Sequence, residues 1–140
     1  MNTKYEKYIN YIVNELEPPY FKTMRENYGL RNDEFNLVLS RLYNRPVDFV
    51  ANKYVYDRQT NMLYYEEHND GDWIKREYDE NDREIYWEDS NGDWHKKEYD
   101  KQGNEVYKES STGYWIRRKY DYQGEQISFE DSFCNIRHIG

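Results

Sequence analysis

The segment GDWIKREYD at residues 71–79 recurs as GDWHKKEYD at residues 92–100 and as GYWIRRKYD at residues 113–121. The copies start 21 residues apart, and each begins with a Gly-x-Trp triplet and ends with a Tyr-Asp pair. Several positions that keep one period indicate structural repeats, in which each repeat packs against its neighbours. The C-terminal two-thirds of the chain is therefore predicted to be a tandem array with a 21-residue period.

Each repeat has the pattern of a strand, a tight turn, a second strand and a longer turn. Asn91 and Gly92 form the dipeptide preferred in two-residue hairpin turns, because both residues tolerate positive φ. The longer turns begin with Asp and two of them end with Gly, as at Asp100 and Gly103, which is typical of a type I turn with a G1 bulge. We predict a twisted antiparallel β-meander of about eight strands.

The turn at Asn91 and Gly92 also predicts a register for the sheet. A two-residue loop there places Glu88 opposite His95 and gathers the repeated Trp and β-branched residues on one face. The repeated tyrosines then lie on the opposite face, among charged residues that pair across neighbouring strands. The predicted structural repeat core consists of Trp73, Trp94, Trp115, Ile85, Val106 and Ile127.

The N-terminal segment has a helical period instead. Ile9, Ile12 and Leu16 fall on one stripe of a helix that is expected at residues 4–17 and stopped by the Pro pair that follows. Gly29 is expected as the left-handed cap of a second helix. Helices are predicted at residues 4–17, at 20–27, and from Asn32 or Asp33 to Tyr43.

The predicted fold class is α+β, with a short helical N-terminal cap followed by the twisted meander of hairpin repeats. The division follows the change of period along the chain. The expected parts are a helical N-terminal segment at residues 1–50, a β-hairpin repeat sheet at residues 51–132 and a C-terminal tail at residues 133–140.

Charge is spread unevenly over the chain. The net charge is −8, and residues 1–50 carry equal numbers of acidic and basic residues, so the whole excess lies in residues 51–140. An acidic surface is unfavourable for phosphate backbones and anionic membranes, so neither is expected as a direct partner. A lone Cys134 and the lack of a signal peptide or a transmembrane run favour a reducing, cytoplasmic location.

The sequence carries no recognisable catalytic or metal-binding pattern. His68, His95 and His138 are not spaced as a ligand cluster, and His95 replaces the Ile of the other repeats, so it is expected to be an exposed strand residue. No cysteine pair is present for zinc, and Cys134 has no basic helper in a known motif. We therefore expect no enzyme activity, no cofactor and no metal.

The Tyr-Asp turns and Gly-x-Trp hairpins at residues 54–131 resemble YD (RHS-type) repeats and, more loosely, MORN-type repeats. Asp82 departs from the pattern, because it stands where the repeat has Gly. The N-terminal stretches KYEKYINYIV at residues 4–13 and ENYGLRNDE at residues 26–34 resemble small phage proteins from marine metagenomes. That resemblance implies a phage origin and action in the host cell cytoplasm.

The function expected from these features is protein–protein interaction. The phage resemblance implies an inhibitor of a host defence system, of the anti-CRISPR type, that blocks a basic nucleic-acid-binding nuclease or complex. The alternatives are a carbohydrate- or surface-binding repeat module and, for assembly, a homodimer formed by pairing of sheet edges. The predicted partner-binding residues are Glu66, Glu67, Tyr86, Glu88, Asp89, Tyr107 and Glu109.

Overall fold

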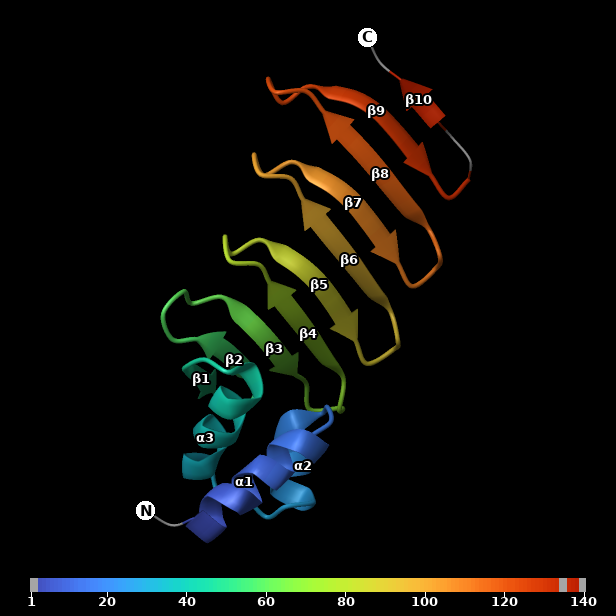
Figure 1. Ribbon diagram of the computed structural model, residues 1–140. Coiled ribbons are helices and arrows are strands. Elements are labelled where there is room, and N and C mark those ends of the chain that lie inside the picture. The colour runs from blue at the N-terminus through green and yellow to red at the C-terminus, as the bar shows by residue number, and fades with distance from the viewer. Residues whose placement is uncertain (1–2, 134–135, 139–140) are drawn as a thin grey trace. The chain divides into compact units, whose positions relative to one another are not determined.

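The structure is a computed structural model that describes residues 3–133 and 136–138, with the side chains of residues 7–133. Contacts divide the chain into two compact units, residues 1–75 and 76–140. The first unit holds three helices and the first strands of the meander (Figure 1). Their bounds are α1 Thr3–Glu15, α2 Tyr20–Glu26, α3 Asn32–Tyr43, β1 Val47–Val50, β2 Tyr54–Asp57, β3 Leu63–Glu67 and the start of β4, Trp73–Tyr78.

The second unit is built, over its described residues, from strands and turns only. Each strand lies antiparallel to the strand that precedes it in the chain, so successive hairpins follow one another (Figure 1). The predicted α+β class and the antiparallel meander are therefore confirmed. The strands are β5 Glu84–Asp89, β6 Trp94–Tyr99, β7 Glu105–Ser110, β8 Trp115–Tyr120, β9 Gln126–Asp131 and β10 Ile136–His138.

The three helices form where the sequence predicts them. Gly29 has a φ of +64°, as expected for a left-handed cap, and the N–H of Leu30 donates to the carbonyl of Met24 at 2.9 Å. The third helix starts after Arg31 rather than at the expected caps Asn32 or Asp33. Glu34 explains the difference, because its carboxylate accepts a hydrogen bond from the N–H of Arg31 at 3.0 Å.

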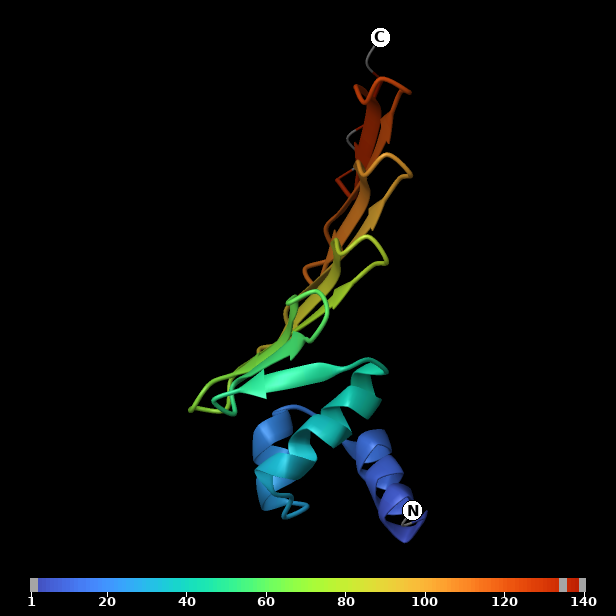
Figure 2. The same cartoon turned by 90° about the vertical axis from the view of Figure 1, so that its left-hand side faces the viewer.

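The main hydrophobic core belongs to the first unit, where the helices pack beside β1–β3 (Figure 2). Ile9 and Ile12 of α1, Phe21 of α2, Phe35 of α3 and Val55 of β2 are all at most 1% exposed. Buried aliphatic and aromatic side chains are thus concentrated in this unit, whereas most aromatic residues of the second unit are half-buried.

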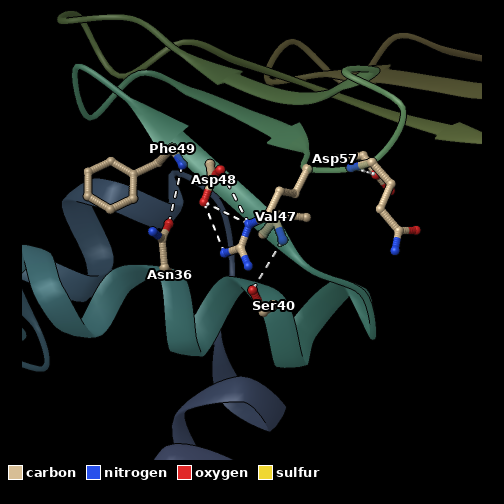
Figure 3. Close-up of polar contacts among 8 residues, drawn as sticks. Asn36, Ser40, Val47, Asp48, Phe49 and Asp57 are labelled. Carbon is tan, nitrogen blue, oxygen red and sulfur yellow. Dashed lines mark hydrogen bonds and ion pairs between the residues drawn. The ribbon is translucent and has the colours of Figure 1, made fainter.

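Helix α3 covers the outer edge of strand β1 through polar side chains (Figure 3). The N–H groups of Val47 and Phe49 donate to Ser40 Oγ and Asn36 Oδ1, both at 3.2 Å. An unsatisfied strand edge is a template for pairing with another chain, and α3 occupies this one. Strand β1 was not predicted, because its four residues fall inside the segment that was expected to be helical.

The predicted register of the hairpins is wrong by one residue. Glu88 faces Trp94 instead of His95, because the loop after Asp89 has three residues and not two. Gly92 takes a φ of +88°, and the N–H of Asp89 donates to the carbonyl of Asp93 at 2.9 Å. Asn91 has no positive φ, so the turn is the three-residue G1 form that was expected only in the longer turns.

The register separates the residues of the predicted repeat core. Trp94 and Trp115 share one face of the second unit, as predicted. The β-branched residues Ile85, Val106 and Ile127 lie on the opposite face. The bulge between Glu98 and Tyr99 contributes, because it places Tyr107 rather than Val106 opposite Glu98.

Strand β10 covers the last repeat strand. Ile136 faces Glu130 and His138 faces Ser128 in an antiparallel pair with β9. Strand β10 therefore covers this edge of β9 over residues 136–138. Cys134 lies outside the described residues, so the reducing location inferred from this lone cysteine stays a prediction.

Candidate functional site

Four side chains recur as a group on one face of the second unit. Tyr86 and Glu88 of β5 face Lys96 and Trp94 of β6, respectively. We call such a group of Tyr, Glu, Trp and a basic residue a tetrad. A further tetrad follows 21 residues later, and the face that carries both is called the ladder face. Its tetrad residues are Tyr86, Glu88, Trp94 and Lys96, followed by Tyr107, Glu109, Trp115 and Arg117.

Hydrogen bonds and cation–π contacts hold each tetrad together. Tyr86 Oη donates to Glu88 Oε1 at 2.9 Å, and Tyr107 Oη donates to Glu109 Oε1 at 2.7 Å. Lys96 Nζ lies 5.1 Å from the centre of the Trp94 ring. These contacts join residues i and i+2 of a strand, which point to the same face of a sheet. The side chains are thus held in place before any partner arrives.

The tyrosines of the ladder face are kept in the protonated form. Burial and the hydrogen bond to Glu88 raise the pKa of Tyr86 to about 12. The hydrogen bond to Glu109 is the main cause that raises the pKa of Tyr107, and burial adds to it. At neutral pH each tetrad therefore offers a phenol oxygen that can still accept a hydrogen bond and a carboxylate beside it.

A shallow groove of about 520 Å³ lies on the second unit between the two tetrads. Lys96 borders it on one strand, and Tyr107, Glu109 and Arg117 border it on the next two. Arg117 lies 5.2 Å from the ring centre of Trp115 and 5.4 Å from that of Tyr107, so its guanidinium group lies beside both aromatic rings of its tetrad. The groove thus joins aromatic surface to charges of both signs.

The first unit contains an earlier copy of the tetrad, formed by Tyr65, Glu67, Trp73 and Lys75. Tyr65 faces Lys75, and Glu67 faces Trp73. Tyr65 Oη donates to Glu67 Oε1 at 2.5 Å, and Lys75 Nζ lies 5.6 Å from the Trp73 ring centre. The residue types, strand positions and internal contacts match those of the ladder face.

The first tetrad binds the beginning of helix α2. The N–H groups of Phe21 and Lys22 donate to Glu67 Oε1 and Oε2, both at 3.0 Å. The N–H of Tyr20 donates to Tyr65 Oη at 2.8 Å, and the two tyrosine rings lie 4.4 Å apart. The N–H groups of a first helical turn lack partners inside the helix, and a carboxylate satisfies them well.

Four of the seven predicted partner-binding residues meet on the ladder face, namely Tyr86, Glu88, Tyr107 and Glu109. Glu67 was expected at the surface. This prediction is wrong, because Glu67 is only 8% exposed and its carboxylate accepts a hydrogen bond from α2. Glu66 points to the opposite face of β3. Asp89 stabilises the turn, because its Oδ1 accepts hydrogen bonds from the N–H groups of Asn91 and Asp93.

The remaining tetrad residues were assigned to the core or not singled out. Trp94 and Trp115 are half-buried, and the buried cluster includes neither of them. Lys96 and Arg117 were not among the predicted partner-binding residues. The signal that identifies the set is the Tyr-x-Glu pair together with the Trp-x-Lys/Arg pair, each repeated every 21 residues.

His95 lies on the face opposite the ladder face and is not the exposed residue that was expected. Its ring stacks on Trp87 with centres 5.3 Å apart, and its side chain is 27% exposed. Burial lowers the pKa of His95, and the charges of Lys97 and Lys108 act in the same direction. Glu84, whose Oε1 lies 3.6 Å from His95 Nε2, opposes them without reversing the shift.

The lowered pKa predicts that acid destabilises this face through His95. The unfolded chain takes up the proton near the ordinary histidine pKa of about 6.5, whereas the folded chain takes it up only at lower pH. The contribution of His95 to stability is therefore present above pH 6.5 or so and is lost as pH falls below it. Urea denaturation from pH 7.5 to 5 checks this, with His95→Ile as the control that lacks the step. An equal loss in both proteins would contradict the assignment.

Other chemistry is not visible in the part of the chain that the structure describes. No group of three or more His, Cys, Asp or Glu side chains there is placed to hold a metal ion. Among the described helices, none has the length and apolar character needed to cross a membrane.

In comparisons with known proteins, neither a protein-family model nor a curated protein sequence matches the chain. The resemblances to YD and MORN-type repeats and to phage proteins thus stay predictions.

Proposed function

We infer that the protein is a protein-binding module whose contact surface is the ladder face. The observation that carries this proposal is the repetition of one ordered tetrad, Tyr, Glu, Trp and a basic residue, on a half-buried face of the second unit. Tyrosine, tryptophan and arginine are the residues most enriched at the energetic centres of protein interfaces. Their pre-ordering lowers the entropy that binding costs.

The charges of the ladder face also suit a protein partner. Besides the two tetrads, this face carries Glu77, Glu98, Lys119 and Glu130, so it presents charges of both signs, five acidic and three basic. Residues 76–140 as a whole carry 10 Lys and Arg against 16 Asp and Glu. Most of that excess lies in the turns, where it can steer a basic partner without being buried.

Binding of carbohydrate is the second candidate, because exposed indole rings can stack on sugars. The positions of the cations argue against it. Lys96 and Arg117 lie within 5.1 and 5.2 Å of the ring centres of Trp94 and Trp115, so one face of each ring is already occupied. The mixed polar and aromatic surface fits a peptide or protein chain better.

The narrower function expected from the sequence is inhibition of a host defence nuclease. Among described residues, Tyr86, Glu88, Tyr107 and Glu109 from that expectation lie where a partner can reach them. An acidic protein with carboxylates at its turns is compatible with a basic channel in the partner. The identity of the partner as a basic nucleic-acid enzyme, and a phage origin, stay predictions.

Replacing the ladder-face tryptophans is expected to abolish partner binding. Lysate proteins captured on the immobilised full chain are identified, purified and titrated against the wild type and against the double variant Trp94→Ala with Trp115→Ala. Loss of two interface anchors should weaken the complex at least about a hundredfold. The matched control is Trp87→Ala, which removes a half-buried tryptophan from the opposite face.

Two results would contradict this function. A partner that tolerates the double variant but not Trp87→Ala would place the contact surface on the other face. Retention of the protein on a glycan array, lost in the double variant, would support the carbohydrate-binding alternative. Circular dichroism of each variant shows whether the fold is intact.

A further inference from the structure

We propose that the second and third tetrads bind the N-terminal turn of a helix in a partner protein, as the first tetrad binds α2. The inference rests on the proposed function and deepens it, since it names the element that the ladder face receives. It comes from comparing three copies of one arrangement in the same chain, of which the first shows its occupant.

The three tetrads are equivalent in register as well as in residue type. In each, the tyrosine faces the basic residue and the glutamate faces the tryptophan across an antiparallel pair. The tyrosine-to-glutamate hydrogen bond is 2.5, 2.9 and 2.7 Å long in the successive copies. Side chains that share a face, a register and an internal hydrogen bond present their acceptor atoms in the same way.

The first tetrad shows which hydrogen-bond donors such a set of acceptors binds. It receives three consecutive backbone N–H groups, those of Tyr20, Phe21 and Lys22. Three consecutive N–H groups that point in one direction and lack partners are a property of a helix start. The aromatic ring of Tyr20 lies on that of Tyr65, so the fitting ligand also begins with an aromatic residue.

The later tetrads keep these acceptors on a face that can be reached. Tyr65 is fully buried and Glu67 nearly so, whereas Tyr86, Glu88, Tyr107 and Glu109 are half-buried. The described part of the second unit contributes no helix to cover them. The groove of about 520 Å³ between the second and third tetrads gives room beside the acceptor atoms.

Charge favours the same occupant. A helix carries a partial positive charge at its N-terminus, and the glutamates of the tetrads are the groups that would meet it. The repeat ends after the third copy, because Ser128 stands 21 residues after Tyr107 and Ile136 faces Glu130 where a tryptophan would be expected. The described part of the second unit therefore offers two such sites.

A peptide with the sequence of residues 17–30, which contains the α2 segment, is the probe that tests this directly. Its addition to the full-length protein labelled with ¹⁵N is expected to shift the indole N–H signals of Trp94 and Trp115, with a dissociation constant of about 1 mM or lower. The same peptide with an N-methyl group on Phe21 lacks one of the donated N–H groups but keeps the ring, and it is expected to bind at least about tenfold more weakly.

Variants of the protein supply the matched controls. Glu88→Gln with Glu109→Gln is expected to weaken binding of the peptide at least about tenfold, because each side chain loses one acceptor oxygen. Glu80→Gln with Glu125→Gln, which changes two exposed carboxylates in turns outside the tetrads and the groove, is expected to leave binding unchanged. Should the first double variant fail to fold, Tyr86→Phe with Tyr107→Phe removes only the two hydroxyl groups.

The outcomes separate this inference from the proposed function. No shift of either indole signal, unchanged binding of the N-methyl peptide, or unchanged binding to the double variant of Glu88 and Glu109 would overturn it. Replacing the ladder-face tryptophans could abolish binding of a partner while the peptide fails to bind the wild type. In that case the proposed function holds, and only the helix start is rejected as its ligand.

Discussion

Replacing Glu67 by alanine is expected to lower the free energy of unfolding by about 2–4 kcal/mol, because two backbone N–H groups and one phenol lose a buried acceptor at once. Among the described residues, the carboxylate of Glu67 accepts the N–H groups of both Phe21 and Lys22. The start of α2 should loosen first. Thermal and urea denaturation followed by circular dichroism measure the loss.

The chain provides its own control for this prediction. Glu109 occupies the same position in the third tetrad and accepts the same tyrosine hydrogen bond, but it is half-buried and binds no helix in the described structure. Glu109→Ala is expected to cost less than about 1 kcal/mol. Equal losses for Glu67 and Glu109 would show that the first tetrad does not hold α2.

Truncation of Phe35 is expected to have the largest effect on stability. Phe35 is fully buried, and its ring lies 5.7 Å from that of Phe21 and 5.6 Å from that of Phe49. Phe35→Ala removes this packing and leaves a cavity, which typically costs about 3–5 kcal/mol. The free energy of unfolding from urea denaturation checks the value.

The matched control is Trp94→Ala in the second unit. The sequence assigned Trp94 to the core, where its loss would cost as much as that of Phe35. Because Trp94 is half-buried and its ring lies beside the exposed side chain of Lys96, a loss of about 1 kcal/mol is expected instead. A cost of 3 kcal/mol or more at Trp94 would restore it to the core and remove it from the contact surface.

The elements of the fold were predictable from the sequence because their signals are local. The apolar stripe of Ile9, Ile12 and Leu16 identifies α1, and the Gly at position 29 marks the end of α2. The repeated turns marked the strands of the meander. Strand β1 was missed because Val47–Val50 has only four residues, and it becomes a strand through its pairing with β2.

The faces of the sheet were not predictable, because they depend on a single residue of loop length. Asn91 and Gly92 favour a two-residue turn, but Asp89 accepts two N–H groups within the loop and stabilises a three-residue form. A shift of one residue moves every side chain to the other face. Trp94 therefore lies on the face of Tyr86 and Glu88 and not on the face of Ile85.

The burial of Glu67 could not be read from the repeats either. The Tyr-x-Glu pair is present in all three copies, and local sequence does not distinguish Glu67 from Glu88 or Glu109. Only the packing of α2 on β3 makes one glutamate a structural residue. Identical local patterns can therefore have different roles when one copy is covered by another element.

The proposed contact surface depends on Tyr86, Glu88, Trp94 and Lys96 sharing one face, and the register of β5 and β6 determines this. The N–H of Asp89 donates to the carbonyl of Asp93, so the next pair, Glu88 and Trp94, is a non-hydrogen-bonded pair with closely spaced Cα atoms. The most direct measurement is a nuclear Overhauser effect between their Hα protons in the full-length protein. A strong cross-peak between Glu88 and Trp94 is predicted. A strong cross-peak between Asp89 and Trp94 instead, which is the non-hydrogen-bonded pair of a two-residue turn, would move the tryptophans to the other face and contradict the ladder face.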